Sequence, residues 1–200
     1  LAANQKILAN ARSDRAACKE CNRNLEQQKK ALQTIGQLSI SRFDYQNAAT
    51  VYQELLAIAE RENDYIYQSI YLDRLAEIYN EATQPTNALK VKLQLVERYN
   101  QEKKIRELAN LKISIANDYQ LLNKPEPASQ NYREAFELAW SLKDFAVASE
   151  SLEKLGNLYQ KYQQIDSALQ IYQQLIKVQQ KAYNYYGLMN NFDRIGQIYL

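Results

Sequence analysis

The chain has 200 residues, and its 25 basic and 23 acidic residues leave a formal net charge of +2, without the strong basic excess of a nucleic-acid-binding protein. Its 4 glycines and 3 prolines are too few for a β-sandwich or barrel with many tight turns. No apolar run approaches the ~18 residues that a membrane-spanning helix needs. We therefore expect neither nucleic acid nor a membrane as partner.

A pattern of small residues recurs along the chain at a fixed interval of 40 residues. Ile or Leu precedes each small residue, and Tyr follows three positions later in four of the five copies. The small residues are Gly36, Ala76, Ala116, Gly156 and Gly196. An unbroken period of this length predicts a stacked-repeat solenoid, in which each repeat contacts only its neighbours.

Each repeat contains two apolar stripes at helical spacing, which we name helix A and helix B. In the fourth copy these stripes run from Val147 to Tyr159 and from Ile165 to Ile176. The link between them is short, so the two helices must be antiparallel neighbours. The expected A helices span 25–41, 65–81, 105–121, 145–161 and 185–200, and the expected B helices span 45–61, 85–101, 125–141 and 165–181.

Small and aromatic residues alternate across the seam between the two helices. Gly156 in helix A and Ala168 in helix B allow a close approach, and the rings of Tyr159 and Tyr172 fill the space around that contact. Lys92 interrupts the aromatic column that lies four residues after the helix B alanine. We expect its methylene stem to lie along the seam and its charge to stay in water.

The sequence also indicates where the helices begin. Pro85 and Pro125 stand at the head of helix B, where a missing N–H costs nothing. Asp44, Asp64 and Asp144 stand immediately before helices, where an aspartate can cap the first turn.

The expected domain organisation is a single solenoid fragment over residues 1–200, excised from a longer protein. Residues 1–24 fit the same register as a degenerate preceding helix. The four repeats cover 25–64, 65–104, 105–144 and 145–184, and 185–200 form the first helix of a fifth, truncated repeat.

Catalytic chemistry has no visible basis in this sequence. Histidine is absent, no Gly-rich phosphate loop occurs, and Cys18 and Cys21 have no second pair to complete four zinc ligands. In register, Cys18 falls in the core and Cys21 on the surface. Glu150 and Glu153 are better explained by a solvated helix face than by acid–base work. We therefore expect a non-enzyme without cofactor or metal.

At these residues the chain resembles the tetratricopeptide repeat family. The matching features are Leu or Ile with Gly or Ala, Tyr three residues on, Ala in helix B and an aromatic four residues later. The period of 40 exceeds the family's usual value of about 34, as in its extended-helix branch of spindle-orientation adaptors, kinesin light chains and bacterial sensor domains. The resemblance implies a right-handed all-α solenoid of antiparallel helix pairs, whose A helices line a concave groove.

Polar residues on helix A are the candidate partner-binding residues. The position after the Gly or Ala carries Gln37, Glu77, Asn117, Asn157 and Gln197, and an amide can pair with the backbone of an extended peptide. Charged residues precede it as Asp73, Arg74, Glu153, Lys154, Asp193 and Arg194. The family's groove for carboxylates implies a role for the asparagines and the nearby basic residues, whereas acidic side chains occupy its upstream Lys position. A plain solvated face is the alternative interpretation.

Trp140 stands in a column that is otherwise Glu60, Asn100 and Gln180. It is either an interface anchor or a side chain folded over the neighbouring helix.

The leading functional hypothesis is a cytoplasmic scaffold for protein–protein interaction that binds an extended peptide or partner segment in the concave groove. The alternative is a regulatory or sensor module of a larger signalling or effector protein. A third hypothesis is self-association through the apolar helix faces at the truncated ends.

Overall fold

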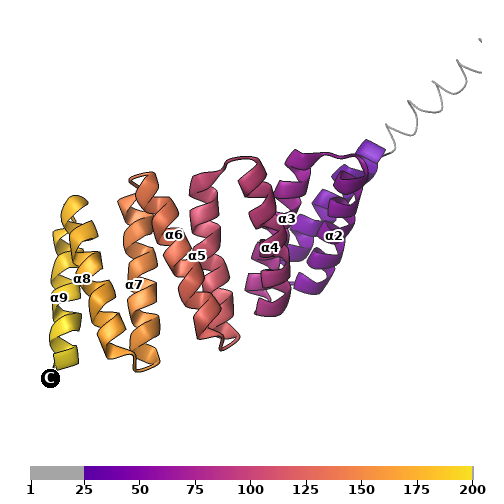
Figure 1. Cartoon of the computed structure of the whole chain (residues 1–200). Coiled ribbons are helices and arrows are strands. Elements are labelled where there is room, and N and C mark those ends of the chain that lie inside the picture. The colour runs from indigo at the N-terminus through magenta and orange to yellow at the C-terminus, as the bar shows by residue number, and fades with distance from the viewer. Residues whose placement is uncertain (1–24, 200) are drawn as a thin grey trace, which may run out of the picture. The chain divides into compact units, whose positions relative to one another are not determined.

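The computed structural model describes residues 25–199 as helices joined by short links, with no strand among them (Figure 1). Residues 25–41 form the first described helix. The helices that follow are α2 (Tyr45–Arg61), α3 (Tyr65–Glu81), α4 (Pro85–Gln101), α5 (Ile105–Leu121), α6 (Pro125–Ser141), α7 (Phe145–Lys161), α8 (Ile165–Lys181) and α9 (Tyr185–Tyr199). The chain is an all-α repeat solenoid, which confirms the expected fold class.

The helices form two compact units that divide between Ala82 and Thr83. In the first unit, the helix of residues 25–41 contacts α2 through Gly36 and Tyr52, and α2 packs on α3. In the second unit, each helix from α4 to α9 packs on the next one. The assignment of one domain with the repeat boundaries given above stays a prediction.

Helices α2 to α8 begin and end at the residues that the sequence predicts. The expected caps are confirmed. The side chains of Asp44, Asp64 and Asp144 each accept a hydrogen bond from the backbone N–H of the third residue of the helix that follows. Pro85 and Pro125 are the first residues of α4 and α6, as expected. The interpretations of residues 1–24, including Cys18 and Cys21, lie outside the described residues.

The links share one backbone geometry. In the link after α2, the Asn63 N–H donates to the Glu60 carbonyl at 3.1 Å and the Asp64 N–H donates to the Ala59 carbonyl at 2.9 Å, which is the Schellman arrangement. The middle residue of each link has a left-handed φ between 53° and 60°, yet none is glycine. These residues are Phe43, Asn63, Thr83, Lys103, Asn123, Lys143, Gln163 and Tyr183. At six of these eight links, where the residue is not asparagine, the chain therefore adopts a conformation that its residue type disfavours.

The close contact between helices A and B is confirmed by the space around the glycines. A Cβ built on Gly156 would lie 2.9 Å from Cδ1 of the Tyr172 ring and closer still to its Cε1, and a Cβ on Gly36 would lie 2.7 Å from the Tyr52 ring. Tyr172 is fully buried, as is Ala168 one helical turn before it. The ring thus occupies the volume that a larger residue in place of the glycine would need.

Replacing Gln163 by Gly is expected to raise the free energy of unfolding by about 1 kcal/mol, because glycine adopts the left-handed φ of 58° without steric penalty. Gln163→Val is expected to lower it. Denaturant titration followed by circular dichroism measures both. Gln170→Gly, at an exposed site inside α8, is the matched control and should cost about 1 kcal/mol. Destabilisation by Gly at both positions would contradict the strain argument.

Replacing Gly156 by Leu is expected to lower the free energy of unfolding by about 1–3 kcal/mol, since the Tyr172 ring must leave its place. Gly196 belongs to the same column, but a Cβ built there meets nothing within 4 Å in the described structure. Gly196→Leu is therefore the matched control and should not lower the free energy of unfolding. Equal melting temperatures for the two variants would refute the close-contact argument.

Candidate binding surface

Two of the predicted site residues hold buried tyrosines. The Tyr132 hydroxyl donates to Asn117 Oδ1 at 2.6 Å, and the Tyr172 hydroxyl donates to Asn157 Oδ1 at 2.8 Å. Gln120 and Gln160, one turn further along helix A, place Oε1 at 3.2 and 3.0 Å from the same hydroxyls. Burial raises the pKa of Tyr132 to about 12, so its hydroxyl keeps its proton at neutral pH. The amide column is thus part of the packing as well as of the surface.

The exposure of the two asparagines differs. Asn117 is half-buried and Asn157 is exposed, although both lie next to a fully buried ring. An asparagine whose Oδ1 accepts from a fixed hydroxyl has its side chain held in one orientation, and its two Nδ2 protons remain as donors. Sequence reasoning missed this internal role. The signal was present as a constant spacing of 15 residues between the amide and the tyrosine.

The charged candidates are paired among themselves or with near neighbours. Arg194 on α9 reaches Glu153 on α7, with Nη2 and Oε1 2.6 Å apart, so the A helices of adjacent repeats meet through this pair. Lys154 lies 3.7 Å from Glu150 on the same helix. Because both members of each pair are partly exposed, such pairs contribute little to stability, about 0–1 kcal/mol. A partner's charges can therefore compete for them.

The remaining candidates are exposed, and they divide between the units. Asp193 and Gln197 on α9 belong to the second unit, together with Asn117, Asn157 and the charged residues just described. Gln37, Asp73, Arg74 and Glu77 belong to the first unit. There Arg74 Nη1 lies 2.5 Å from Glu77 Oε2, and both side chains line a hollow of about 460 Å³ with the aromatic rings of Phe43 and Tyr45.

Trp140 is folded over the neighbouring helix, which is one of the two interpretations that the sequence left open. Its ring lies 5.9 Å from the Phe136 ring on the same helix and 5.8 Å, edge to face, from the Phe145 ring on α7. It nevertheless keeps 36% of its surface exposed. Lys181 Nζ stands 4.7 Å from the centre of the ring. Trp140 is therefore folded against its neighbours and still offers one side to solvent.

The expectation for Lys92 is wrong. Its ammonium is buried rather than in water, and Nζ lies 2.6 Å from Oδ2 of Asp118 on α5, with side chains only 2% and 4% exposed. Burial lowers the pKa of Lys92 and raises that of Asp118, although the hydrogen bond between them opposes both shifts. The physical reason is that a second position, on the neighbouring helix, also departs from the repeat pattern. Asp118 stands 26 residues after Lys92, where the other repeats pair a tyrosine with Ile or Leu.

Shifted pKa values can mark a catalytic site, but this pair is enclosed by packed helices and does not line any of the hollows described here. Among the described residues, no group of three or more His, Cys, Asp or Glu side chains is arranged to hold a metal ion.

Within residues 25–199, none of the helices has the length and apolar character needed to cross a membrane.

No protein-family model and no curated protein matches the chain. Several solved structures, in contrast, are similar to the chain. BtubC (BKLC) from P. vanneervenii is 20% identical over 85% of this chain and 71% of that chain, with a TM-score of 0.65. Aspartyl phosphate phosphatase F from Bacillus subtilis is 18% identical, covering 82% of this chain and 43% of that chain, with a TM-score of 0.65.

A Signal Transduction ATPase with Numerous Domains from Pyrococcus horikoshii, described as having a tetratricopeptide repeat sensor, is 14% identical with a TM-score of 0.67. The match covers 82% of this chain and 26% of that one. These likenesses show the fold, which is that of tetratricopeptide-like repeat proteins. The resemblance that the sequence predicts is thereby confirmed at the level of fold.

Converting the buried ion pair to the residues of the neighbouring repeats provides a test of its role. Lys92→Tyr or Asp118→Leu alone is expected to cost about 3–5 kcal/mol of unfolding free energy, because each leaves one buried charge unpaired. The double variant is expected to be neutral or up to about 4 kcal/mol more stable than the parent. Denaturant titration of all four proteins completes the cycle. Additive losses would show that the two side chains are not energetically coupled.

Proposed function

We propose that this chain is a non-catalytic protein-interaction module whose A helices bind an extended segment of a partner protein. In the second unit the binding face consists of polar side chains from α5, α7 and α9. They are Asn117, Glu153, Lys154, Asn157, Asp193, Arg194 and Gln197. In the first unit Gln37, Asp73, Arg74 and Glu77 form a polar surface of their own. The helical-repeat fold supports an interaction module, and the finer assignment rests on these side chains.

The observation that carries the proposal is the support beneath Asn157. Its side chain is exposed, yet its Oδ1 is held at 2.8 Å by the hydroxyl of the fully buried Tyr172. Holding the amide in one orientation lowers the conformational entropy lost when a partner binds. The Nδ2 donors can then pair with a backbone carbonyl or a carboxylate of an extended peptide. Asn117 repeats the arrangement over Tyr132.

The neighbouring charges suit the same kind of ligand. Arg194 and Glu153 form a bridge between α9 and α7 that is 34% and 43% exposed. Exchange of Glu153 for a partner's carboxylate would leave the number of ion pairs unchanged, so the exchange costs little. The partner segment therefore carries a carboxylate next to backbone groups that reach Asn157.

The proposal can be tested with peptides selected from a random display library on the 200-residue chain. Fluorescence polarisation of labelled peptides measures their affinity. Replacing Asn157 and Arg194 together by Ala is expected to weaken binding at least about tenfold, a loss typical of central interface residues. Circular dichroism verifies that helicity is kept.

Two control variants separate a surface role from a structural one. Tyr172→Phe breaks the same hydrogen bond as Asn157→Ala but leaves the amide on the surface. Glu153→Ala breaks the same ion pair as Arg194→Ala but leaves the guanidinium. Tyr172→Phe is expected to weaken binding less than Asn157→Ala does, because the amide loses its fixed orientation but keeps its Nδ2 donors. Glu153→Ala is expected not to weaken binding, because the guanidinium of Arg194 stays available to a partner's carboxylate. If each control weakens binding as much as its counterpart, the two residues act through packing and the proposal is wrong.

The alternative, a regulatory or sensor module within a larger protein, is favoured by the likeness to a signal-transduction ATPase described as having a tetratricopeptide repeat sensor. The gene sequence beyond both ends of the chain decides this question. A nucleotide-binding or DNA-binding domain beside the repeats would support the alternative. Helical repeats throughout would count against it.

A further inference from the structure

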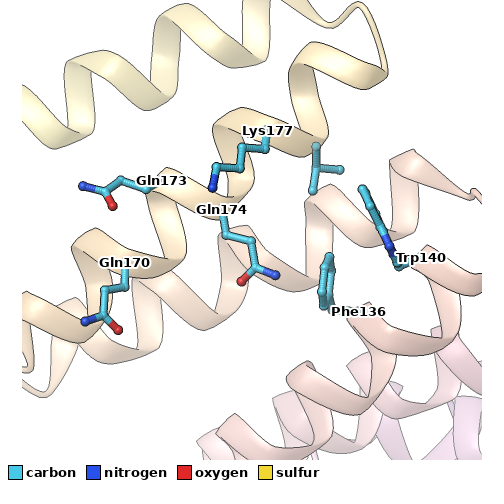
Figure 2. Close-up of a pocket in the computed structure, with 7 residues that line it drawn as sticks. Phe136, Trp140, Gln170, Gln173, Gln174 and Lys177 are labelled. Carbon is cyan, nitrogen blue, oxygen red and sulfur yellow. The ribbon is translucent and has the colours of Figure 1, made fainter.

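A hollow on the B-helix side of the second unit is not used by the proposed function. It lies between α6 and α8 and has a volume of about 520 Å³ (Figure 2). Phe136 and Trp140 project into it from α6, and glutamines and Lys177 project from α8. Ligand pockets in proteins have volumes of about 300–1,000 Å³, so the hollow has room for one or two side chains of a partner.

One wall of this Trp140 hollow is aromatic and rigid. The Phe136 and Trp140 rings lie 5.9 Å apart, and Phe145 of α7 supports Trp140 at 5.8 Å from the side. A supported ring loses little conformational entropy on binding, which is why tryptophan is enriched among the residues that dominate interface energies. This wall is suited to an apolar side chain.

The opposite wall is polar and cationic. Gln170, Gln173 and Gln174 of α8 provide amide donors and acceptors that can bind a peptide backbone. Lys177 lines the same wall, and Lys181 stands 4.7 Å from the centre of the Trp140 ring. Of the described residues that line the hollow, none is acidic. The charge that complements this wall is therefore negative.

Comparison with the other repeats shows that packing does not require these residues. The positions equivalent to Trp140 carry Glu60, Asn100 and Gln180. The positions equivalent to Lys177 carry Ala57, Glu97 and Glu137, so a cation occurs at this position only in the last of these repeats. An aromatic side chain and a cation thus occur at two exposed positions that line one hollow, where the other repeats carry neither.

We propose that the Trp140 hollow is a second docking surface, which binds a peptide segment of a partner protein with an apolar side chain on Trp140 and a carboxylate beside Lys177 and Lys181. A nucleic acid would also satisfy an aromatic ring and two cations. The net charge of +2 and the three glutamines favour the acidic peptide, because nucleic-acid-binding domains carry a strong basic excess. The inference is independent of the A-helix face.

The test uses the fact that Trp140 is the only tryptophan of the chain. Peptides from a random display library are selected on the 200-residue protein, with the Trp140→Gln protein as counter-selection. The enriched peptides are expected to combine acidic residues with an aromatic or aliphatic one and to shift the Trp140 fluorescence. Trp140→Gln and Lys177→Glu are each expected to weaken binding at least about tenfold. Binding should also weaken as salt is raised.

Two controls define the result. Gln is the residue that the equivalent position 180 carries, and circular dichroism verifies the fold of each variant. Lys161→Glu changes the net charge as Lys177→Glu does, at a lysine 5.7 Å from the Tyr162 ring and outside the hollow, and should leave affinity unchanged. The A-face variants Asn157→Ala and Arg194→Ala should also leave these peptides unaffected, so failure of one site is distinguishable from failure of the other.

Several outcomes overturn the proposal. They are enrichment of no peptide, enrichment of peptides without acidic residues, equal binding to the Trp140→Gln protein, and a fluorescence shift with a single-stranded oligonucleotide but with no peptide.

Discussion

The packing depends on one contact, between a small residue of helix A and an aromatic ring of helix B. In the fourth repeat the Tyr172 ring of α8 occupies the space beside Gly156 of α7. The Tyr172 hydroxyl donates to Asn157, which is the residue after Gly156. The contact sets the distance between the helices, and the hydrogen bond satisfies the polar end of a buried ring. Tyrosine is suited to this place because its apolar body and polar tip are satisfied by neighbouring residues of one helix.

This constraint explains much of the unusual composition. Sixteen tyrosines are present, and several of their hydroxyls are bound by amides. Gln33 donates to Tyr71 at 3.0 Å and Gln53 donates to Tyr79 at 2.7 Å. A buried hydroxyl without a partner costs about 1–3 kcal/mol, so each ring in a seam requires a polar residue nearby. The amides are therefore structural partners first, and those that remain exposed are available to bind another molecule.

The sequence predicted the ends of α2 to α8 because 17-residue helices and three-residue links repeat without insertion. It could not show the left-handed links, since no glycine marks them and residues such as Gln163 and Tyr183 give no turn signal. Packing of the helices on either side imposes that conformation. The buried pair of Lys92 and Asp118 was missed for a different reason. Each residue alone looks like a polar exception, and only the comparison of two positions 26 residues apart shows that both changed together.

Residues that depart from the repeat pattern fall into two classes, buried and exposed. Only the exposed ones are candidates for a role in binding. Lys92 departs at a buried position, and Asp118 compensates for it within the core, so folding alone explains the pair. Trp140 and Lys177 depart at exposed positions, where Gln180 and Glu137 show that the same fold accepts other residues. Packing therefore explains a compensated change inside the solenoid. It does not require an aromatic ring and a cation beside one open hollow, since other repeats fold without them, and this is the pattern expected where a surface is shaped by what it binds.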